Sequence, residues 1–286
     1  MNQNIKKNNT RNVIDVVTSP LQAFLKLEAS SGILLLLVAI MAMVFANSSA
    51  LSELYFSFIN LPVSMSLGSF RLDKTLLLLV NDGLMAIFFF LVGLEIKREV
   101  MIGELSSPGK AAFSFLAAIG GMLVPALIYV MFNLSSGHTI GWGIPMATDI
   151  AFALGVVTVL GKRVPTTIKV FLLALAIVDD LGAILVIALF YTGEISTWFL
   201  SLASMSLFSL FVLNHAGYRN LGVGIILGFI TWFFFLKSGV HATIAGVLLA
   251  FLTPARKNTT PKSSESDDHL LIDDYIHGLH PWVAFG

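Results

Sequence analysis

Apolar runs long enough to cross a membrane recur along this 286-residue chain and constrain its fold more than any other feature. A helix of roughly 20 apolar residues spans the ~30 Å hydrocarbon core of a bilayer. The runs predict an all-α polytopic membrane protein with eight spans. Residues 281–286 contain an interfacial Trp followed by apolar residues, which predicts the start of a ninth helix. The eight runs lie near 20–47, 75–96, 111–133, 139–160, 167–191, 198–215, 221–237 and 239–254.

The composition supports this class and excludes others. The chain is 56% apolar and 12% charged, whereas soluble domains have about 45–50% apolar and about 25% charged residues. Its formal net charge is zero, so no nucleic-acid partner is predicted. It has no cysteine, which excludes disulfides and thiolate metal sites.

The basic residues orient the chain in the bilayer. With a cytoplasmic N-terminus, all but three of the 17 Lys and Arg residues face the cytoplasm, the exceptions being Arg71, Lys74 and Lys237. We therefore expect a cytoplasmic tail (1–18), a transmembrane domain (19–254) and a cytoplasmic loop (255–280). Within the domain, 51–73 alternates weakly around a Pro and a Gly, which predicts a periplasmic β-hairpin.

Two adjacent carboxylates interrupt the fifth run, in ALAIVDDLGAILV (174–186). Each ionised Asp at mid-helix costs about 2.5–3.5 kcal/mol. We expect Asp179 and Asp180 to share protons, which an arriving cation would displace. This competition is the minimum machinery of an antiporter. In the alternative, one Asp pairs with a basic residue of a neighbouring helix and serves packing, although Lys169 and Lys237 lie at helix ends.

The fourth run carries a third carboxylate, in GWGIPMATDIAFALG (141–155). Pro145 removes a backbone donor, which predicts a broken helix that lines a cavity. Asp149 would neutralise the exposed helix ends, and Thr148 would offer a hydroxyl to a dehydrated cation. A simple proline kink with a solvated Asp149 is the alternative.

Other charged groups have plainer interpretations. Asp82, near the outer end of the second span, is expected to snorkel or cap. Glu95 and Glu99 flank Lys97 and Arg98, either as a solvated helix end or as the lining of a negatively charged entrance.

The histidines admit similar alternatives. His241 opens the eighth run, where a helix-end or packing role is expected. His277 and His280 lie in the cytoplasmic segment among aspartates and form either a pH-responsive surface or a solvated loop.

Several motifs together resemble the NhaA family of bacterial sodium/proton antiporters, from about residue 30 to the last residue. The specific ones are GWGIPMATDIAFALGVVTVLGKRVP and FLLALAIVDDLGAILVIALFYT, with FFFLVGLEIKREV, LKSGVHATIAGV and LHPWVA in support. The resemblance implies a fold of twelve transmembrane helices in which two broken helices cross near the midplane. It implies that Asp179 and Asp180 bind Na⁺ and protons, and that Thr148 and Asp149 belong to the first broken helix.

The resemblance also implies a homodimer through the hairpin and a pH-responsive cytoplasmic funnel, whose residues here are Glu95, Arg98, Glu99, His277 and His280. There are two departures. Ile276 stands where family members carry Glu, although Asp274 is near. Helices nine to twelve, with the second broken helix, are missing, so a transport-inactive fragment is the alternative for this chain.

Enzyme classes fit the motifs poorly. An intramembrane aspartyl protease needs two aspartates on separate helices, typically with a Gly-x-Gly-Asp motif, whereas the strongest acids here are adjacent on one helix and that motif is absent. A prenyltransferase needs a third Asp and a basic diphosphate clamp, which are also absent. A retinal pump needs a mid-helix lysine for its cofactor, and none is present, so no cofactor is predicted. We expect a non-enzymatic secondary transporter of the bacterial inner membrane that exchanges cytoplasmic Na⁺ or Li⁺ for external protons.

Overall fold

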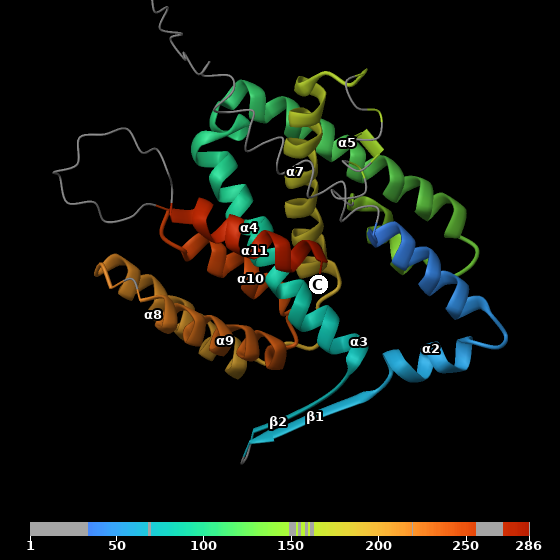
Figure 1. Cartoon of the computed structure of the whole chain (residues 1–286), viewed down its shortest axis with the longest axis horizontal. Coiled ribbons are helices and arrows are strands. Elements are labelled where there is room, and N and C mark those ends of the chain that lie inside the picture. Colours follow the sequence, from blue (N-terminus) through green and yellow to red (C-terminus); the bar gives the residue numbers. More distant parts are fainter. Residues whose placement is uncertain are drawn as a thin grey trace, which may run out of the picture.

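The computed structural model of the chain describes residues 34–67, 70–148, 153, 156–157, 160, 163–218, 220–255 and 271–285, and these are mostly helical (Figure 1). The α-helices are Leu34–Asn47, α2 (Ser52–Ile59), α3 (Leu76–Leu79), α4 (Met85–Ile102), α5 (Pro108–Asn133), α7 (Thr166–Phe190), α8 (Thr197–His215), α9 (Leu221–Ser238), α10 (Thr243–Leu252) and α11 (Leu271–Phe285). The π-helix η1 (Val80–Leu84) joins α3 to α4, and η2 (Glu104–Ser106) and η3 (Thr139–Met146) are 3₁₀-helices. Two strands, β1 (Pro62–Leu67) and β2 (Phe70–Thr75), form a hairpin.

Five helices of the described residues are long and apolar enough to cross a membrane, and the chain is therefore a multi-pass membrane protein. A sixth is added if the pair Leu34–Asn47 and Ser52–Ile59, bent by 114°, counts as one span. The predicted count of eight is not confirmed. The five helices are Leu76–Ile102, Ala111–Asn133, Thr167–Phe190, Thr197–His215 and Leu221–Ser238.

Two predicted runs differ from continuous spans. The run 239–254 yields only the ten-residue α10, about 15 Å long. It is short because Gly239 adopts a left-handed conformation with φ of 84° and Pro254 follows its end. The run 139–160 begins as η3 rather than as an α-helix. Residues 1–33, which include the expected tail, lie outside the described part.

The hairpin begins later than the sequence predicted. Its antiparallel register pairs Pro62 with Thr75 and Leu67 with Phe70, and residues 52–59 form α2 instead of a strand. The expected range 51–73 is corrected accordingly. Glu53 in the first turn of α2 complements the helix dipole. In Figure 1 the strands project from the lower edge of the helical body.

Helix α11 also begins earlier than expected, at Leu271 within the predicted cytoplasmic loop. Ile272 and Ile276 are buried against Leu91, Leu94 and Ala250. Since they are four residues apart, they lie on one face of a helix, and this face docks α11 on α4. Residues 256–270 of the predicted loop lie outside the described part.

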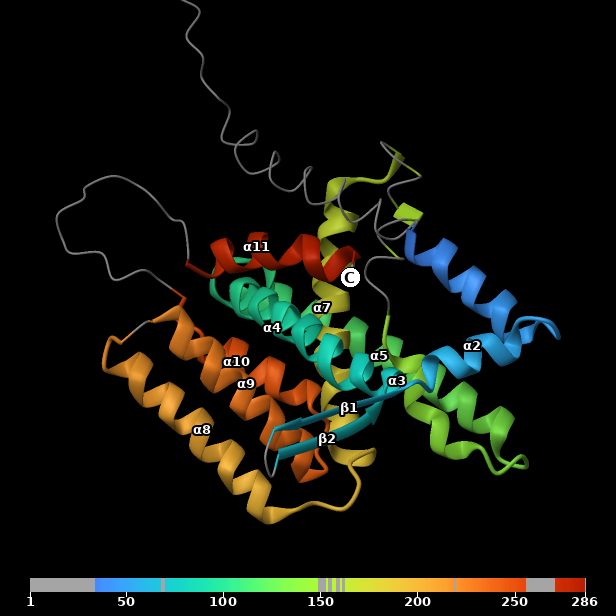
Figure 2. The ribbon, with the colours of Figure 1, turned by 60° about the horizontal axis from the view of Figure 1, so that its bottom comes forward.

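Helix α4 is the central packing element. Helices α10 and α11 both pack against it, and α8 and α9 form an antiparallel pair beyond α10 (Figure 2). On α4, Val92 and Ile96 are buried with Ile177 of α7. Helix α5 and η3 in turn pack against α7. This arrangement places the middle of α7 inside the helical body.

Candidate ion-binding site

The two adjacent carboxylates lie in the buried middle of α7. Asp179 is 3% exposed and Asp180 is 7% exposed, and the preceding Ala176, Ile177 and Val178 are buried as well. Burial follows from the neighbours of α7, which packs against α5, α4 and η3. The prediction that the pair is removed from solvent is confirmed by these exposures.

Asp179 contacts the segment that follows η3. Its carboxyl group accepts hydrogen bonds from the side chain and the backbone N–H of Thr148. Its Oδ1 atom is buried and has no hydrogen-bond partner among the described residues. A carboxyl oxygen that is buried in this way is available to a proton or to a desolvated cation. The structure therefore brings together Thr148 and Asp179, two of the predicted site residues, and leaves one carboxyl oxygen of Asp179 without a partner among the described residues.

The alternative of a structural ion pair finds no support at Asp179. Within the described residues, no Lys or Arg forms a salt bridge with this side chain. No group of three acidic or histidine side chains that could hold a metal ion occurs in the same part of the chain. Asp149, the third predicted carboxylate, lies outside the described residues. The described site thus consists of two carboxylates and one hydroxyl.

The interruption before Thr148 is present. η3 contains Pro145 and ends at Met146, and Ala147 is extended with φ of −89° and ψ of 146°. An eight-residue 3₁₀-helix is unusually long for this type of helix. Its backbone groups must find partners other than a continuing α-helical ladder. Thr148 donates its backbone N–H to Asp179 for this reason.

The predicted pH-response residues divide between α4 and α11. Arg98 Nε lies 2.8 Å from Asp273 Oδ1 across these helices. His280 is buried and His277 is exposed on α11. Burial and the nearby charge of His277 hold the pKa of His280 below its ordinary value.

The acidic partner of Arg98 was not predicted. The sequence analysis named Asp274 only as an acid near His277 and His280, whereas the structure pairs Arg98 with Asp273. A helical projection of α11 would have pointed to Asp273 as this partner. Asp273 lies three residues before the buried Ile276 and therefore next to the face that docks on α4. Glu95 and Glu99 lie half-buried on α4, and the Glu99 side chain folds over Gly103.

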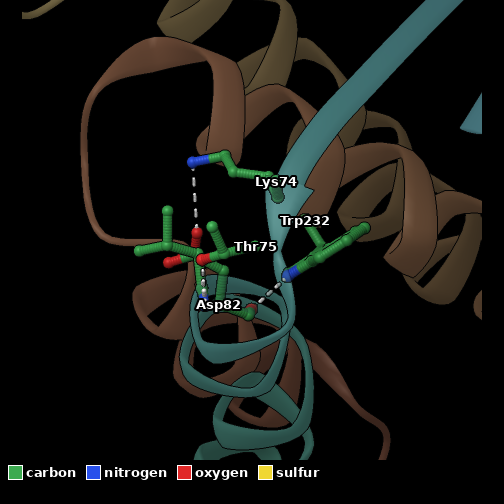
Figure 3. Close-up of polar contacts among 5 residues, drawn as sticks. Lys74, Thr75, Asp82 and Trp232 are labelled. Atoms are coloured by element: carbon green, nitrogen blue, oxygen red, sulfur yellow. Dashed lines mark hydrogen bonds and ion pairs between the residues drawn. The ribbon is translucent and has the colours of Figure 1, made fainter. Parts of the chain in front are cut away.

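Asp82 belongs to a separate cluster at the other end of the α3–α4 span (Figure 3). Its Oδ2 lies 3.4 Å from Lys74 Nζ at the base of the hairpin, and its backbone oxygen accepts a 2.6 Å hydrogen bond from Trp232 Nε1 of α9. The side chain pairs with a lysine and neither caps a helix nor joins the buried carboxylates. Trp232 thus supplies a side-chain donor to a backbone oxygen of the π-helical turn.

Comparison with known proteins agrees with this architecture. A sequence model of the family described as Na⁺/H⁺ antiporter 1 matches residues 22–286. The Na(+)/H(+) antiporter NhaA of Escherichia coli (strain K12) is 50% identical over 266 residues, which cover 93% of this chain and 66% of that protein. The Na(+)/H(+) antiporter NhaA of Serratia proteamaculans (strain 568) is 51% identical over 270 residues, covering 94% of this chain and 67% of that protein. The chain thus spans about two thirds of the length of these relatives, and it belongs to the Na⁺/H⁺ antiporter 1 family.

Proposed function

We propose that the chain acts as a secondary transporter that exchanges cytoplasmic Na⁺ or Li⁺ for external protons across a bacterial inner membrane, with its N-terminus in the cytoplasm. The observation that carries the proposal is the buried pair Asp179 and Asp180 beside Thr148 of an interrupted helix. The relatives named as Na⁺/H⁺ antiporters support it by similarity.

The chemistry follows from burial. In a medium of low dielectric constant, two adjacent carboxylates favour protonated forms, and the first ionisation disfavours the second. A cation that trades its hydration shell for carboxylate and hydroxyl oxygens displaces the protons, and protons displace the cation on the other side. Thr148 and Asp149 complete the oxygen shell and compensate the interrupted backbone. Occupancy shifts the chain between two accessible states, since each ligand favours the state that it binds better.

The first experiment measures proton movement in everted membrane vesicles that contain the 286-residue chain. Respiration acidifies the lumen, and added Na⁺ should collapse the pH gradient. Asp179→Asn and Asp180→Asn should each abolish the collapse, and Asp82→Asn, a matched change outside the buried pair, should preserve it. Collapse that persists in Asp179→Asn would remove the central claim.

The same vesicles test whether the chain is a transport-inactive fragment. Absence of Na⁺-dependent collapse in the parental chain would favour the fragment, provided that the chain is inserted. Fusion to the C-terminal third of a longer relative should then restore exchange, and Asp179→Asn should abolish it again. These two results would support the proposed ion site and would exclude transport by the 286-residue chain alone.

We propose further that two copies associate through the hairpin. β1 and β2 form a two-stranded sheet, so both outer edges carry backbone groups that can pair with another strand. Deletion of 62–75 should convert a dimer into a monomer in detergent, as measured by light scattering. A deletion variant that remains dimeric would contradict the proposal.

A further inference from the structure

Tyr191 ends the helix that carries the two buried carboxylates, and its side chain contacts η3. The hydroxyl donates a 2.5 Å hydrogen bond to the backbone oxygen of Ile140 and accepts a 2.9 Å hydrogen bond from the backbone N–H of Gly143. Ile140 and Gly143 are three residues apart, so they are the acceptor and donor that a regular 3₁₀ turn would pair directly. The phenol of Tyr191 therefore bridges this turn and ties it to α7.

The absence of a side chain at Gly143 permits this approach. A Cβ atom at Gly143 would lie 2.9 Å from both the hydroxyl and the Cε2 atom of Tyr191. Trp142 packs beside the same ring, with ring centroids 6.3 Å apart, and against Phe190 at 5.1 Å. The end of α7 and η3 thus form one packed aromatic contact.

Tyr191 is also held from its other side. Its backbone oxygen lies 3.3 Å from His241 Nε2, in the turn before α10. The contact with His241 uses only the backbone oxygen of Tyr191, so the phenol of Tyr191 remains available for its hydrogen bonds with η3. The end of α7 is therefore anchored independently of its contact with the interrupted segment.

The segment 139–148 meets α7 at two separate places. The outer one is the Tyr191 bridge, and the inner one is the contact of Thr148 with Asp179. We propose that Tyr191 is a positioning residue for the ion site: its hydroxyl fixes the outer end of this segment on α7 so that Thr148 reaches Asp179. The proposal rests on the proposed role of Asp179 and Asp180 in ion binding.

Tyr191→Phe tests the proposal, because it removes both hydrogen bonds and keeps the ring. Tyr129→Phe is the matched control. Tyr129 comes from α5 and donates to the backbone oxygen of His138 at 3.2 Å, so it holds the residue directly before the segment without tying it to α7. Both variants lose a phenolic hydroxyl at the same end of η3.

The position of the segment is read directly with a thiol reporter. The chain has no cysteine, so Met146→Cys, at a buried position in η3, introduces a single thiol. Maleimide should label it at least about fivefold faster in the Tyr191→Phe background, because the lost hydrogen bonds loosen the segment. Tyr129→Phe should change the rate by less than about twofold. Gly143→Ala should also accelerate labelling, since its Cβ displaces the phenol.

Transport supplies the second readout. Tyr191→Phe should raise the apparent KM for Na⁺ several-fold and retain the maximal rate, because the carboxylates remain but Thr148 is misplaced. Equal labelling in the Tyr191→Phe and parental backgrounds, or an equal acceleration in Tyr129→Phe, would overturn the proposal. Faster labelling with an unchanged apparent KM would overturn the link to the ion site. The labelling result needs no transport, so it distinguishes failure of this proposal from failure of the proposed function.

Discussion

Gly93 of α4 faces Ala250 of α10 so closely that a Cβ atom on Gly93 would lie 2.7 Å from the Ala250 Cβ. Gly246 of α10 makes a second close approach, where a Cβ atom would lie 2.9 Å from the backbone nitrogen of Phe90. Small residues allow helix backbones to approach in this way in membranes. Two such contacts make α4 and α10 one packed unit.

Gly93→Ala should therefore destabilise the protein. Overpacking costs about 1–3 kcal/mol, which exceeds the gain of about 1 kcal/mol that Ala brings in helix propensity. Thermal unfolding in detergent measures the effect as a lower midpoint. Gly224→Ala is the matched control, because Gly224 lies in α9 with nothing within 4 Å of its added Cβ. An equal loss in both variants would contradict the packing argument.

Lys97 should stabilise the end of α10. Its Nζ donates to the backbone oxygens of Phe251 at 2.7 Å and Thr253 at 2.6 Å. Lys97→Met leaves these acceptors without their donor, at a cost of about 1–3 kcal/mol, and removes a cation from the negative end of the helix dipole. Amide hydrogen exchange over 249–253 should become faster. Lys169→Met, at the start of α7, should leave this exchange unchanged.

Trp232 should hold the π-helical turn that precedes the N-terminal end of α4. Trp232→Phe keeps an aromatic ring and loses the 2.6 Å hydrogen bond to the Asp82 backbone oxygen (Figure 3). We expect a lower midpoint of thermal unfolding, equivalent to about 1 kcal/mol. Trp198→Phe is the control, since Trp198 is exposed on α8. A midpoint unchanged by Trp232→Phe would mean that the turn is stable without this bond.

The docking of α11 on α4 should weaken in mild acid. Burial and the charge of His277 lower the pKa of His280 below 6.5 in the folded state. The unfolded state therefore binds the proton more readily, so the contribution of neutral His280 is complete above its ordinary pKa and is lost as the pH falls through the lower folded pKa. His277 is the charged group that acts on His280, and Arg98 of α4 forms an ion pair with Asp273 of α11 at the same pair of helices.

Hydrogen exchange of 271–283 measures this effect, after correction for the intrinsic pH dependence of exchange. Protection of α11 should fall as the pH drops below the ordinary pKa of histidine, and less so in His280→Gln. His277→Gln removes one cause of the lowered pKa of His280, so His280 should titrate closer to its ordinary pKa and the loss of protection in acid should be smaller than in the parental chain. Identical pH profiles in the parental chain and His280→Gln would exclude His280 as the titrating group.

Local features of the sequence were sufficient for much of the site. The burial of Asp179 and Asp180 followed from the apolar run around them, and the interruption before Thr148 followed from Pro145. The register of the hairpin did not follow, because a short segment such as 52–59 supports either a helix or a strand until its neighbours decide. The length of α10 depended on the turn at Gly239.

The sequence by itself determined the family, the membrane class and the positions of the acidic pair, because each depends on residue identity along a continuous stretch. Only the tertiary structure decided that Asp273 pairs with Arg98, that Lys97 reaches the end of α10, and that Tyr191 bridges Ile140 and Gly143. These partners lie far apart in the chain, between about 50 and 175 residues for each pair by their numbering. Such contacts depend on how helices pack and rotate against one another, which no local pattern specifies.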